Sequence, residues 1–290
     1  MNPLSASPAR ALVVRIGALG DVLLTRRLAF GLSVGGERVS LLAPARHASL
    51  LRRDPWIEQI LDAESPVFAK AFIGLWPEEP RGFARAIVIS SAMELGRAVV
   101  AAAGSVRMVS PAPARTDRSI AEQWAEASPH PRGEAPPLPT LPVDPALAVA
   151  RDLLVIHAGS GSRDKNWSPD RFSSLAERLR EAGHQVGWLR GPADAHLPDA
   201  PASCVALDGL NLDQLASTLA CARGFVGNDS GVAHLSGAVG APTLAIFGPT
   251  SSTVFRPDGP RVRALDSPEG DLEELSVETV LIATTDLLRA

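Results

Sequence analysis

The sequence predicts an α/β protein made of two doubly wound halves, each a parallel sheet with helices between its strands. Three observations support this fold class. Short apolar runs, typical of strands buried on both faces, alternate with segments in which apolar residues recur at helical spacing. This alternation occurs twice, before and after a proline-rich stretch. Glycine-containing turns follow several predicted strands, and in such sheets ligands bind at the carboxyl ends of the strands.

The first half alternates strands and helices from its beginning. Residues 11–16 (ALVVRI) form a nearly continuous apolar run, and apolar residues at roughly helical spacing follow until the glycine pair 35–36 ends the helix. The other predicted strands of this half are 38–42, 56–61, 85–90 and 105–109, and the other predicted helices are 48–53 and 94–103.

A change of composition predicts the boundary between the halves. Prolines are frequent from residue 110 to 145, and they disfavour core elements because proline lacks an N–H donor and has a fixed φ. Within this stretch only 118–127 has a helical pattern. We therefore predict a linker at 110–145, an N-terminal domain at 1–145 and a C-terminal domain at 146–290.

The second half repeats the pattern. Pro169 stands where proline is tolerated, at the start of a helix that continues to residue 181. The predicted strands are 153–157, 185–189, 204–207, 225–226 and 243–247. The other predicted helices are 212–221, 230–240 and 277–288. With a linker between them, the two halves are expected to leave a cleft in which ligands bind.

Composition narrows the function classes. A net charge of −4 provides no general attraction to nucleic acid. Cys204 and Cys221 lack metal-ligand spacing and favour a reducing compartment. The first residues lack the features of a secretory signal, and no apolar run approaches the ~18 residues of a membrane-spanning helix. We therefore expect a soluble, cytoplasmic protein that does not bind nucleic acid.

The first turn that could carry chemistry is 17–21 (GALGD). It lacks the third glycine and the acidic partner of the dinucleotide-binding fingerprint. Asp21 stands at the start of a helix, where a carboxylate is stabilised. Asp21 could cap this helix, or it could face the cleft and accept a proton from a hydroxyl group.

Two turns of the second half offer groups that bind anions. The turn 158–167 (AGSGSRDKNW) contains the hydroxyls of Ser160 and Ser162 and the charge of Lys165, which suit a phosphate, although it is not a P-loop. The alternative is a flexible surface loop.

The other anion-binding turn begins the helix predicted at 230–240. Asp229, Ser230, Gly231 and His234 lie within one helical turn, where backbone amides and the helix dipole favour an anion. The alternative is an ordinary capped helix. Asp194, beyond another strand end, could accept ribose hydroxyls or be a solvated loop charge.

Four segments carry a resemblance to a known family: VVRIGALGDVLLT, VIHAGSGSRDKNWSPDRF, the GPAD loop and GNDSGVAHLSGAVGAPTLAIFGPT. In their order and spacing the chain resembles glycosyltransferase family 9, the heptosyltransferases of the bacterial lipopolysaccharide core. The resemblance implies the GT-B fold, with two Rossmann-like domains facing across a cleft, the acceptor in the N-terminal one and the donor in the C-terminal one. It also implies inverting transfer of a sugar, typically from ADP-heptose.

The resemblance also implies roles for particular residues, with Asp21 as the catalytic base and Lys165 as a stabiliser of the leaving diphosphate. It implies no metal and no cofactor. The donor-binding residues that it implies are Ser160, Ser162, Lys165, Asp194 (for the ribose), Asp229, Ser230, Gly231 and His234. The implied partners are a nucleotide-sugar donor and a glycan or glycolipid acceptor, including one at the inner membrane surface.

Some features depart from the family's pattern and keep other functions open. Ala158 replaces a proline, the pair 232–233 replaces proline–methionine, and the N-terminal half looks short, so the acceptor is not defined. A nucleotide-sugar epimerase or hydrolase and a non-catalytic nucleotide-sugar binding protein are the alternatives on the same fold. Asp21 disfavours the pure binding protein, which needs no base.

Overall fold

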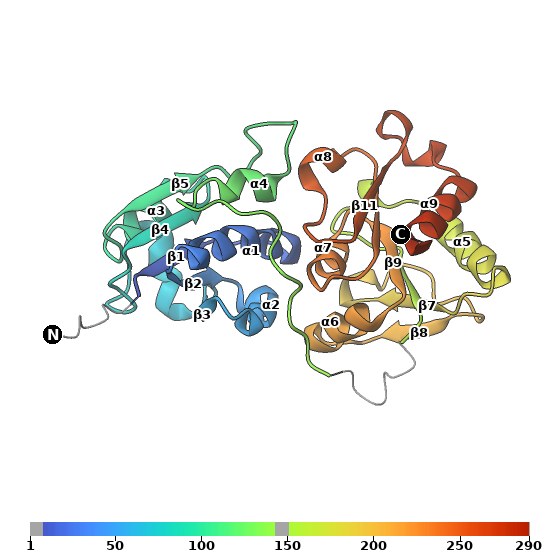
Figure 1. The fold of residues 1–290 in the computed structure, drawn as a ribbon, viewed down its shortest axis with the longest axis horizontal. Helices are drawn as coiled ribbons and strands as arrows, with labels where there is room; N and C mark the ends of the chain where they lie inside the picture. The colour runs from blue at the N-terminus through green and yellow to red at the C-terminus, as the bar shows by residue number, and fades with distance from the viewer. Residues whose placement is uncertain (1–7, 143–150, 290) are drawn as a thin grey trace. The chain divides into compact units, whose positions relative to one another are not determined.

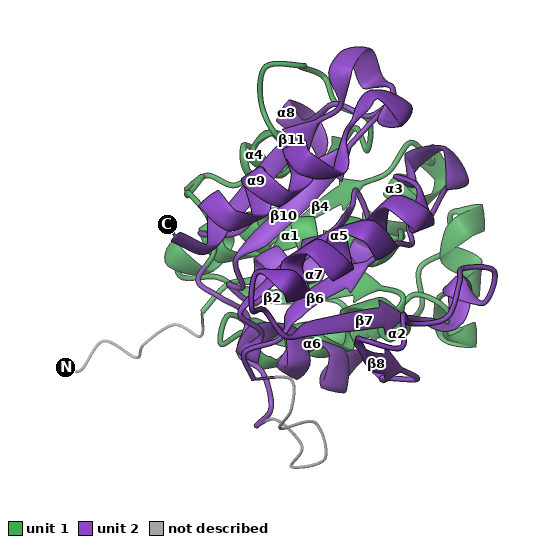
Figure 2. Ribbon diagram, turned by 90° about the vertical axis from the view of Figure 1, so that its right-hand side faces the viewer, with its two compact units in different colours: residues 1–135 green, residues 136–290 purple. Residues whose placement is uncertain are grey.

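The chain forms two compact units. The computed structural model describes residues 8–142 and 151–289, and the units comprise Met1–Ala135 and Pro136–Ala290 (Figure 2). The domain boundary that we predicted between residues 145 and 146 lies outside the described residues. Each unit contains one parallel sheet whose strands are separated in sequence by helices, so the predicted α/β fold class is confirmed.

Unit 1 is built on a five-stranded parallel sheet with the order β3-β2-β1-β4-β5 (Figure 1). The strands are β1 (Arg10–Val14), β2 (Arg38–Ala43), β3 (Ile57–Asp62), β4 (Arg85–Ile89) and β5 (Val106–Val109). The α-helices are α1 (Leu19–Val34), α2 (Ala45–Ala48), α3 (Met93–Val99) and α4 (Ile120–Ala125), and 3-10 helices span Ser49–Arg53 and Pro66–Ile73. The strand order reverses between β1 and β4, which places a topological switch point there.

Part of the expected linker is folded onto unit 1. Residues 110–135 belong to this unit, and α4 packs against α1. Ser119 and Glu122 cap the start of α4 reciprocally. Trp124 is buried, and its Nε1 donates a hydrogen bond of 3.1 Å to the carbonyl of Ser110. This segment therefore contains a packed helix with prolines on both sides. The helix packs on the unit because burial of its tryptophan removes apolar surface from water.

Unit 2 is built on a six-stranded parallel sheet with the order β11-β10-β9-β6-β7-β8. The strands are β6 (Leu154–His157), β7 (Val186–Arg190), β8 (Val205–Asp208), β9 (Gly224–Asn228), β10 (Thr243–Phe247) and β11 (Val262–Asp266). The α-helices are α5 (Pro169–Glu181), α6 (Leu212–Cys221), α7 (Gly231–Ala238), α8 (Ser252–Phe255) and α9 (Val277–Arg289). Short 3-10 helices span Arg163–Lys165, Pro192–Asp194, Pro268–Gly270 and Leu272–Glu274. The strand order reverses between β6 and β9, the position at which doubly wound sheets bind nucleotides.

One strand and one α-helix of unit 2 were missing from the sequence interpretation. β11 pairs only with β10 in the described sheet, and all five of its residues are partly or fully exposed. An edge strand of this kind lacks the apolar run that we used to recognise buried strands. α8 is four residues long, which is too short for a periodic pattern to appear.

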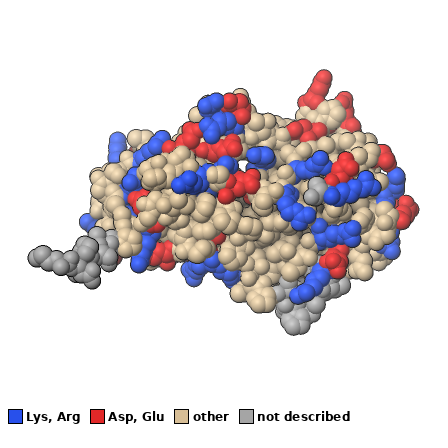
Figure 3. Space-filling model, viewed as in Figure 1, with Lys and Arg blue, Asp and Glu red and all other residues tan. Residues whose placement is uncertain are grey.

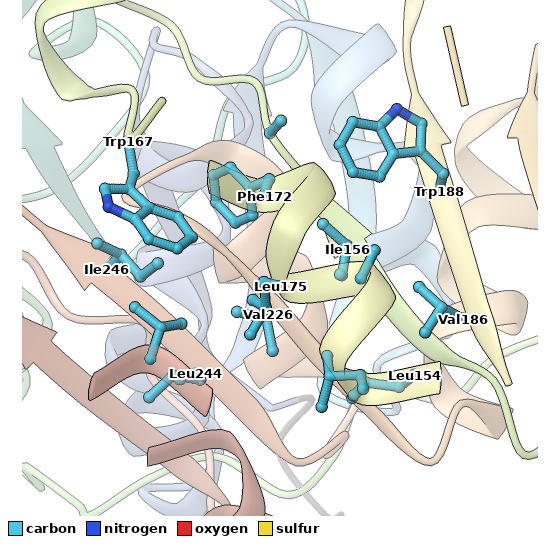
Figure 4. Close-up of a cluster of buried hydrophobic side chains, with 14 of the residues drawn as sticks. Leu154, Ile156, Trp167, Phe172, Leu175, Val186, Trp188, Val226, Leu244 and Ile246 are labelled. Atoms are coloured by element: carbon cyan, nitrogen blue, oxygen red, sulfur yellow. The ribbon is translucent and has the colours of Figure 1, made fainter. Parts of the chain in front are cut away.

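The core of unit 2 packs α5 and α9 against the sheet. Trp167 and Phe172 are fully buried, and their rings meet edge to face with centroids 4.8 Å apart. The same buried cluster includes Val226 of β9 and Ile246 of β10, and Figure 4 shows the Trp167 ring next to Ile246. Trp167 is the last residue of the turn that carries Lys165, so the core anchors one end of a candidate binding loop.

Candidate nucleotide-sugar site

The candidate site residues of unit 2 follow the carboxyl ends of four neighbouring strands. The turn 158–167 follows β6, the turn 191–194 follows β7, residues 229–231 follow β9, and residues 248–250 follow β10. All these strands are parallel, so their carboxyl ends meet at one edge of the sheet. The predicted residues are therefore brought to the switch point between β6 and β9.

Asn228 ties the turn 158–167 to β9. Its Nδ2 donates a 2.9 Å hydrogen bond to the carbonyl of Ala158, and its Oδ1 accepts one of 2.9 Å from the amide of Trp167. The side chain is completely buried. The residue that caps α7 is Ser230, whose Oγ accepts a hydrogen bond from the amide of Ala233 at 3.2 Å.

Lys165 is bound to Asp229, which lies just before the start of α7. Its Nζ donates a 2.7 Å hydrogen bond to Oδ2 of Asp229, and the hydroxyl of Thr250 donates to the same oxygen at 2.8 Å. The Asp229 side chain is 6% exposed and that of Lys165 is 32% exposed. A buried carboxylate thus fixes a cation that solvent can still reach. Thr250 was not among the predicted site residues, although it is the last residue of a segment that carries the family resemblance.

The two serines of the same turn bond to each other. The Ser160 hydroxyl donates to the carbonyl of Ser162 at 2.6 Å and accepts from the amide of Ser162 at 3.2 Å. Ser162 is exposed, and a Cβ at Gly161 would meet no atom within 4 Å. The turn therefore has a defined backbone with open space beside it.

The first turn of α7 adds backbone donors to this edge. Gly231 and Val232 start the helix, where amide groups have no partner within the helix and the dipole is positive. His234 is 8% exposed on the same short helix. Ser230, Gly231 and His234 therefore lie together as predicted from their spacing.

Asp194 forms a buried pair with His157 that the sequence interpretation missed. Oδ2 of Asp194 accepts 2.9 Å and 2.7 Å hydrogen bonds from Nε2 of His157 and the amide of Gly191. The residue is 5% exposed, so it is not a solvated loop charge. Gly159 lies against it, and a Cβ at Gly159 would overlap Oδ1 of Asp194. The histidine is 37 residues away, so only the adjacency of β6 and β7 could reveal it.

The pairing changes the ionisation of Asp194. Burial opposes the charged form, but the hydrogen bond and charge of His157, the Gly191 amide and the charge of His196 outweigh it. The pKa of Asp194 is therefore lower than its usual value.

Asp194→Asn is expected to lower the free energy of unfolding by about 1–3 kcal/mol at pH 7, because a buried charge-assisted hydrogen bond is lost. A folded pKa below the unfolded value means that the wild-type carboxylate stabilises the fold above its unfolded pKa of about 3.9. This contribution disappears as the pH falls through the lower, folded pKa. Urea unfolding should therefore show a smaller difference between variant and wild type at about pH 3 than at pH 7. Asp199→Asn is the control, since Asp199 is 91% exposed. Equal differences at both pH values would contradict the assignment.

In unit 1, Asp21 caps α1 and is also accessible. Its Oδ2 accepts a 3.1 Å hydrogen bond from the amide of Ala18, and its Oδ1 accepts one of 2.7 Å from Nη2 of Arg15. The side chain remains 36% exposed. A Cβ at Gly17 would come within 2.7 Å of Oδ2, so the carboxylate requires a glycine there. The two interpretations of Asp21 are thus compatible, because capping leaves the carboxylate open to solvent.

Four further features bear on function: possible metal clusters, membrane-spanning helices, surface charge and free thiols. In the ranges 8–142 and 151–289, no group of three or more His, Cys, Asp or Glu side chains is arranged to hold a metal ion. Nor does a helix within these ranges have the length and apolarity needed to cross a membrane. Figure 3 shows basic and acidic side chains interspersed over much of the visible face. Cys204 and Cys221 are free thiols.

Comparison with known proteins identifies the family. The model of glycosyltransferase family 9 (heptosyltransferase) matches residues 98–282, which is more than half of the chain. The chain belongs to glycosyltransferase family 9. The matched segment includes every candidate site residue of unit 2, whereas Asp21 lies outside it.

Curated relatives in this family align over part of their length. Lipopolysaccharide heptosyltransferase 1 of Pseudomonas aeruginosa is 35% identical over 103 residues, which are 34% of this chain and 29% of that protein. Lipopolysaccharide heptosyltransferase 3 of Escherichia coli K12 is 28% identical over 166 residues, 49% of this chain and 48% of that protein. The chain thus aligns with less than half the length of these relatives.

Solved structures of family members share the fold over nearly the whole chain. A family 9 glycosyltransferase from Veillonella parvula superposes with a TM-score of 0.77 at 18% identity and covers 99% of both chains. The E. coli heptosyltransferase WaaC with ADP has a TM-score of 0.75 at 17% identity, covering 96% of this chain and 99% of that one. The predicted GT-B fold, with two Rossmann-like units, is confirmed.

Proposed function

We propose that this protein is an inverting glycosyltransferase that transfers a sugar, heptose, from a nucleotide-diphosphate donor such as ADP-heptose to a hydroxyl of a lipopolysaccharide-core or related glycan acceptor. The observation that carries the proposal is the Lys165–Asp229–Thr250 cluster at the switch point of unit 2, beside the amides that start α7. A reachable cation and backbone donors on a nucleotide-binding edge suit a diphosphate. Membership in family 9 supports a sugar as the group transferred.

In this proposal each donor-site residue has a distinct task. Lys165 and the first amides of α7 bind the diphosphate and stabilise the negative charge that grows on it as it leaves, without a metal or other cofactor. Asp229 holds Lys165 and does not itself contact the diphosphate, because its own charge would repel it.

The remaining groups shape and complete the donor site. The ring of His234 and the hydroxyls of Ser162 and Ser160 complete the phosphate contacts, and the Ser160 hydroxyl turns from the carbonyl of Ser162 to the phosphate when the donor binds. Oδ1 of Asp194 is the oxygen left for a ribose hydroxyl, since Oδ2 already accepts two hydrogen bonds.

The chemical step in this proposal begins at Asp21 of the N-terminal domain, which binds the acceptor. The acceptor hydroxyl transfers its proton to the Asp21 carboxylate while its oxygen bonds to the anomeric carbon. The bond from that carbon to the diphosphate breaks in the same step, and the nucleoside diphosphate leaves. One displacement inverts the anomeric configuration. We propose that the acceptor is a glycan or glycolipid, including one at the inner membrane surface, and that the enzyme works in the cytoplasm, where its two free thiols stay reduced.

Lys165→Met is expected to weaken ADP binding about 10–100-fold, because a charge-assisted hydrogen bond to phosphate contributes roughly 1.5–3 kcal/mol. Thermal unfolding with ADP, UDP, GDP and CDP measures this, since ligand binding raises the melting temperature. Lys70→Met is the matched control, because Lys70 is exposed in unit 1. We expect ADP to stabilise the wild type and Lys70→Met strongly and Lys165→Met weakly. A protein that no nucleotide stabilises would refute the donor assignment.

Incubation with ADP-heptose alone separates the alternative enzymes. A transferase should leave the donor largely unchanged until an acceptor is added, whereas an epimerase or a hydrolase would consume it. Product analysis that shows donor conversion without acceptor would replace the transferase proposal.

A further inference from the structure

Asp21 is joined to a second charged side chain of unit 1. Nη2 of Arg15 donates to Oδ1 of Asp21 at 2.7 Å, and the amide of Ala18 donates to Oδ2 at 3.1 Å. The Arg15 side chain is 12% exposed, against 36% for Asp21. The guanidinium is therefore the more buried partner of the pair, and hydrogen bonds to both oxygens restrain the rotation of the carboxylate.

Arg15 reaches across the switch point of the unit 1 sheet. It directly follows β1, and its amide donates to the carbonyl of Leu42 in β2 at 3.0 Å. Its Nη1 donates to the carbonyl of Ile89 at the end of β4, at 3.4 Å. The main chain is thus fixed to one neighbouring strand and the side chain to the other, so the position of the guanidinium is set by the sheet.

Trp124 of α4 supplies the other surface that holds Arg15. Cζ of Arg15 lies 5.1 Å from the centroid of the Trp124 ring. This distance is typical of a cation–π contact, which gains strength when water is excluded, and Trp124 is 1% exposed. The Nε of Arg15 is buried without a hydrogen-bond partner among the described residues. The guanidinium therefore contacts both the ring and the carboxylate, in a position that leaves its Nε without a hydrogen bond to the described residues.

We infer that Arg15, stacked on Trp124, is a positioning residue that orients the Asp21 carboxylate for proton transfer. The inference rests on the proposed function, because it assumes that Asp21 is the base. A planar guanidinium can stack on the ring and present Nη2 to the carboxylate at once, which an ammonium group cannot do. It also gives α4, in the segment that we expected to be a linker, a part in catalysis.

Arg15→Ala is expected to lower kcat for transfer about 100-fold, because misplacement of a catalytic group by about 1 Å costs that much. The KM for the donor and the affinity for ADP should stay within about twofold of the wild-type values, since the donor residues lie in unit 2. Free guanidinium ion at millimolar concentration should restore part of kcat. Arg15→Lys should restore it only partly, and Trp124→Phe should retain more activity than Trp124→Leu.

Arg10→Ala is the matched control, because Arg10 stacks on Phe83 at 4.6 Å at the other end of β1. It should keep wild-type kcat and show no response to guanidinium. Unchanged kcat in Arg15→Ala, or a loss that guanidinium does not restore in a variant that still unfolds cooperatively, would overturn the positioning role.

Asp21→Asn distinguishes a failure of Asp21 as the base from a failure of Arg15 as the positioning residue. If this variant stays active, the proposed base is wrong, and the positioning role falls with it. If Asp21→Asn is inactive while Arg15→Ala is unaffected, only the positioning role is overturned.

Discussion

Asp21→Asn is expected to lower kcat for sugar transfer by about 10²–10⁴-fold, the usual contribution of a general base. The amide has nearly the same shape as the carboxylate and can still accept a hydrogen bond from Ala18, so α1 should remain capped. It cannot accept the proton of the acceptor hydroxyl. Transfer is measured by following nucleoside diphosphate release with acceptor present, and ADP binding should stay close to that of the wild type.

A second carboxylate in unit 1 provides the control for this experiment. Asp62 ends β3, and its Oδ1 also accepts backbone hydrogen bonds, from the amides of Ala45 and Glu64. Asp62→Asn should therefore keep wild-type kcat. Loss of ADP affinity in Asp21→Asn, without loss of kcat at saturating donor, would assign Asp21 to binding and contradict its role as base.

Asp54→Ala is expected to lower the free energy of unfolding by about 3–5 kcal/mol, because it leaves a buried charge without its partner carboxylate. Arg26 of α1 donates from Nε and Nη2 to the two oxygens of Asp54 at 2.7 and 2.8 Å. The two residues are 4% and 1% exposed. Denaturant unfolding measures the change.

The double replacement Arg26→Met with Asp54→Leu should recover most of this loss. Burial raises the pKa of Asp54 even though the hydrogen bond and charge of Arg26 oppose the shift, so desolvation outweighs the pairing. Removing both charges removes that cost. Glu58→Ala is the control, since Glu58 pairs with Arg38 at the surface and should lose under about 1 kcal/mol. A similar, small loss in Asp54→Ala and Glu58→Ala would contradict the structural role.

The sequence predicts the strands of both sheets well where they are buried on both faces. β1, β6 and β10 consist mainly of apolar residues, and parallel sheets covered by helices require such runs. β11 escapes prediction because an edge strand tolerates charges. The packing of α4 is not predicted either, because the proline content of the segment 110–145 does not indicate whether Trp124 is buried.

For the candidate site, too, the sequence predicts the residue types but not the contacts between them. The residue types of the turns after β6 and β9 predict an anion site, because small residues leave backbone amides accessible, a helix start favours negative charge and a lysine can bind phosphate. The partners are not predictable from local pattern. Asn228 bonds to residues 61 and 70 positions away, and Lys165 bonds to a carboxylate 64 positions away.

By itself, the sequence determined the α/β class, the order of most elements and the turns at which chemistry can occur. These follow from local periodicity, from glycine and proline, and from the polar groups that each turn contains. The tertiary structure decided which of those polar groups meet. The Lys165–Asp229–Thr250 cluster, the buried Asp194–His157 pair and the Arg15–Asp21–Trp124 contact all join segments that only the sheet order or helix packing brings together. In a parallel sheet, neighbouring carboxyl ends belong to strands far apart in the chain, so their side-chain pairing depends on the fold as a whole.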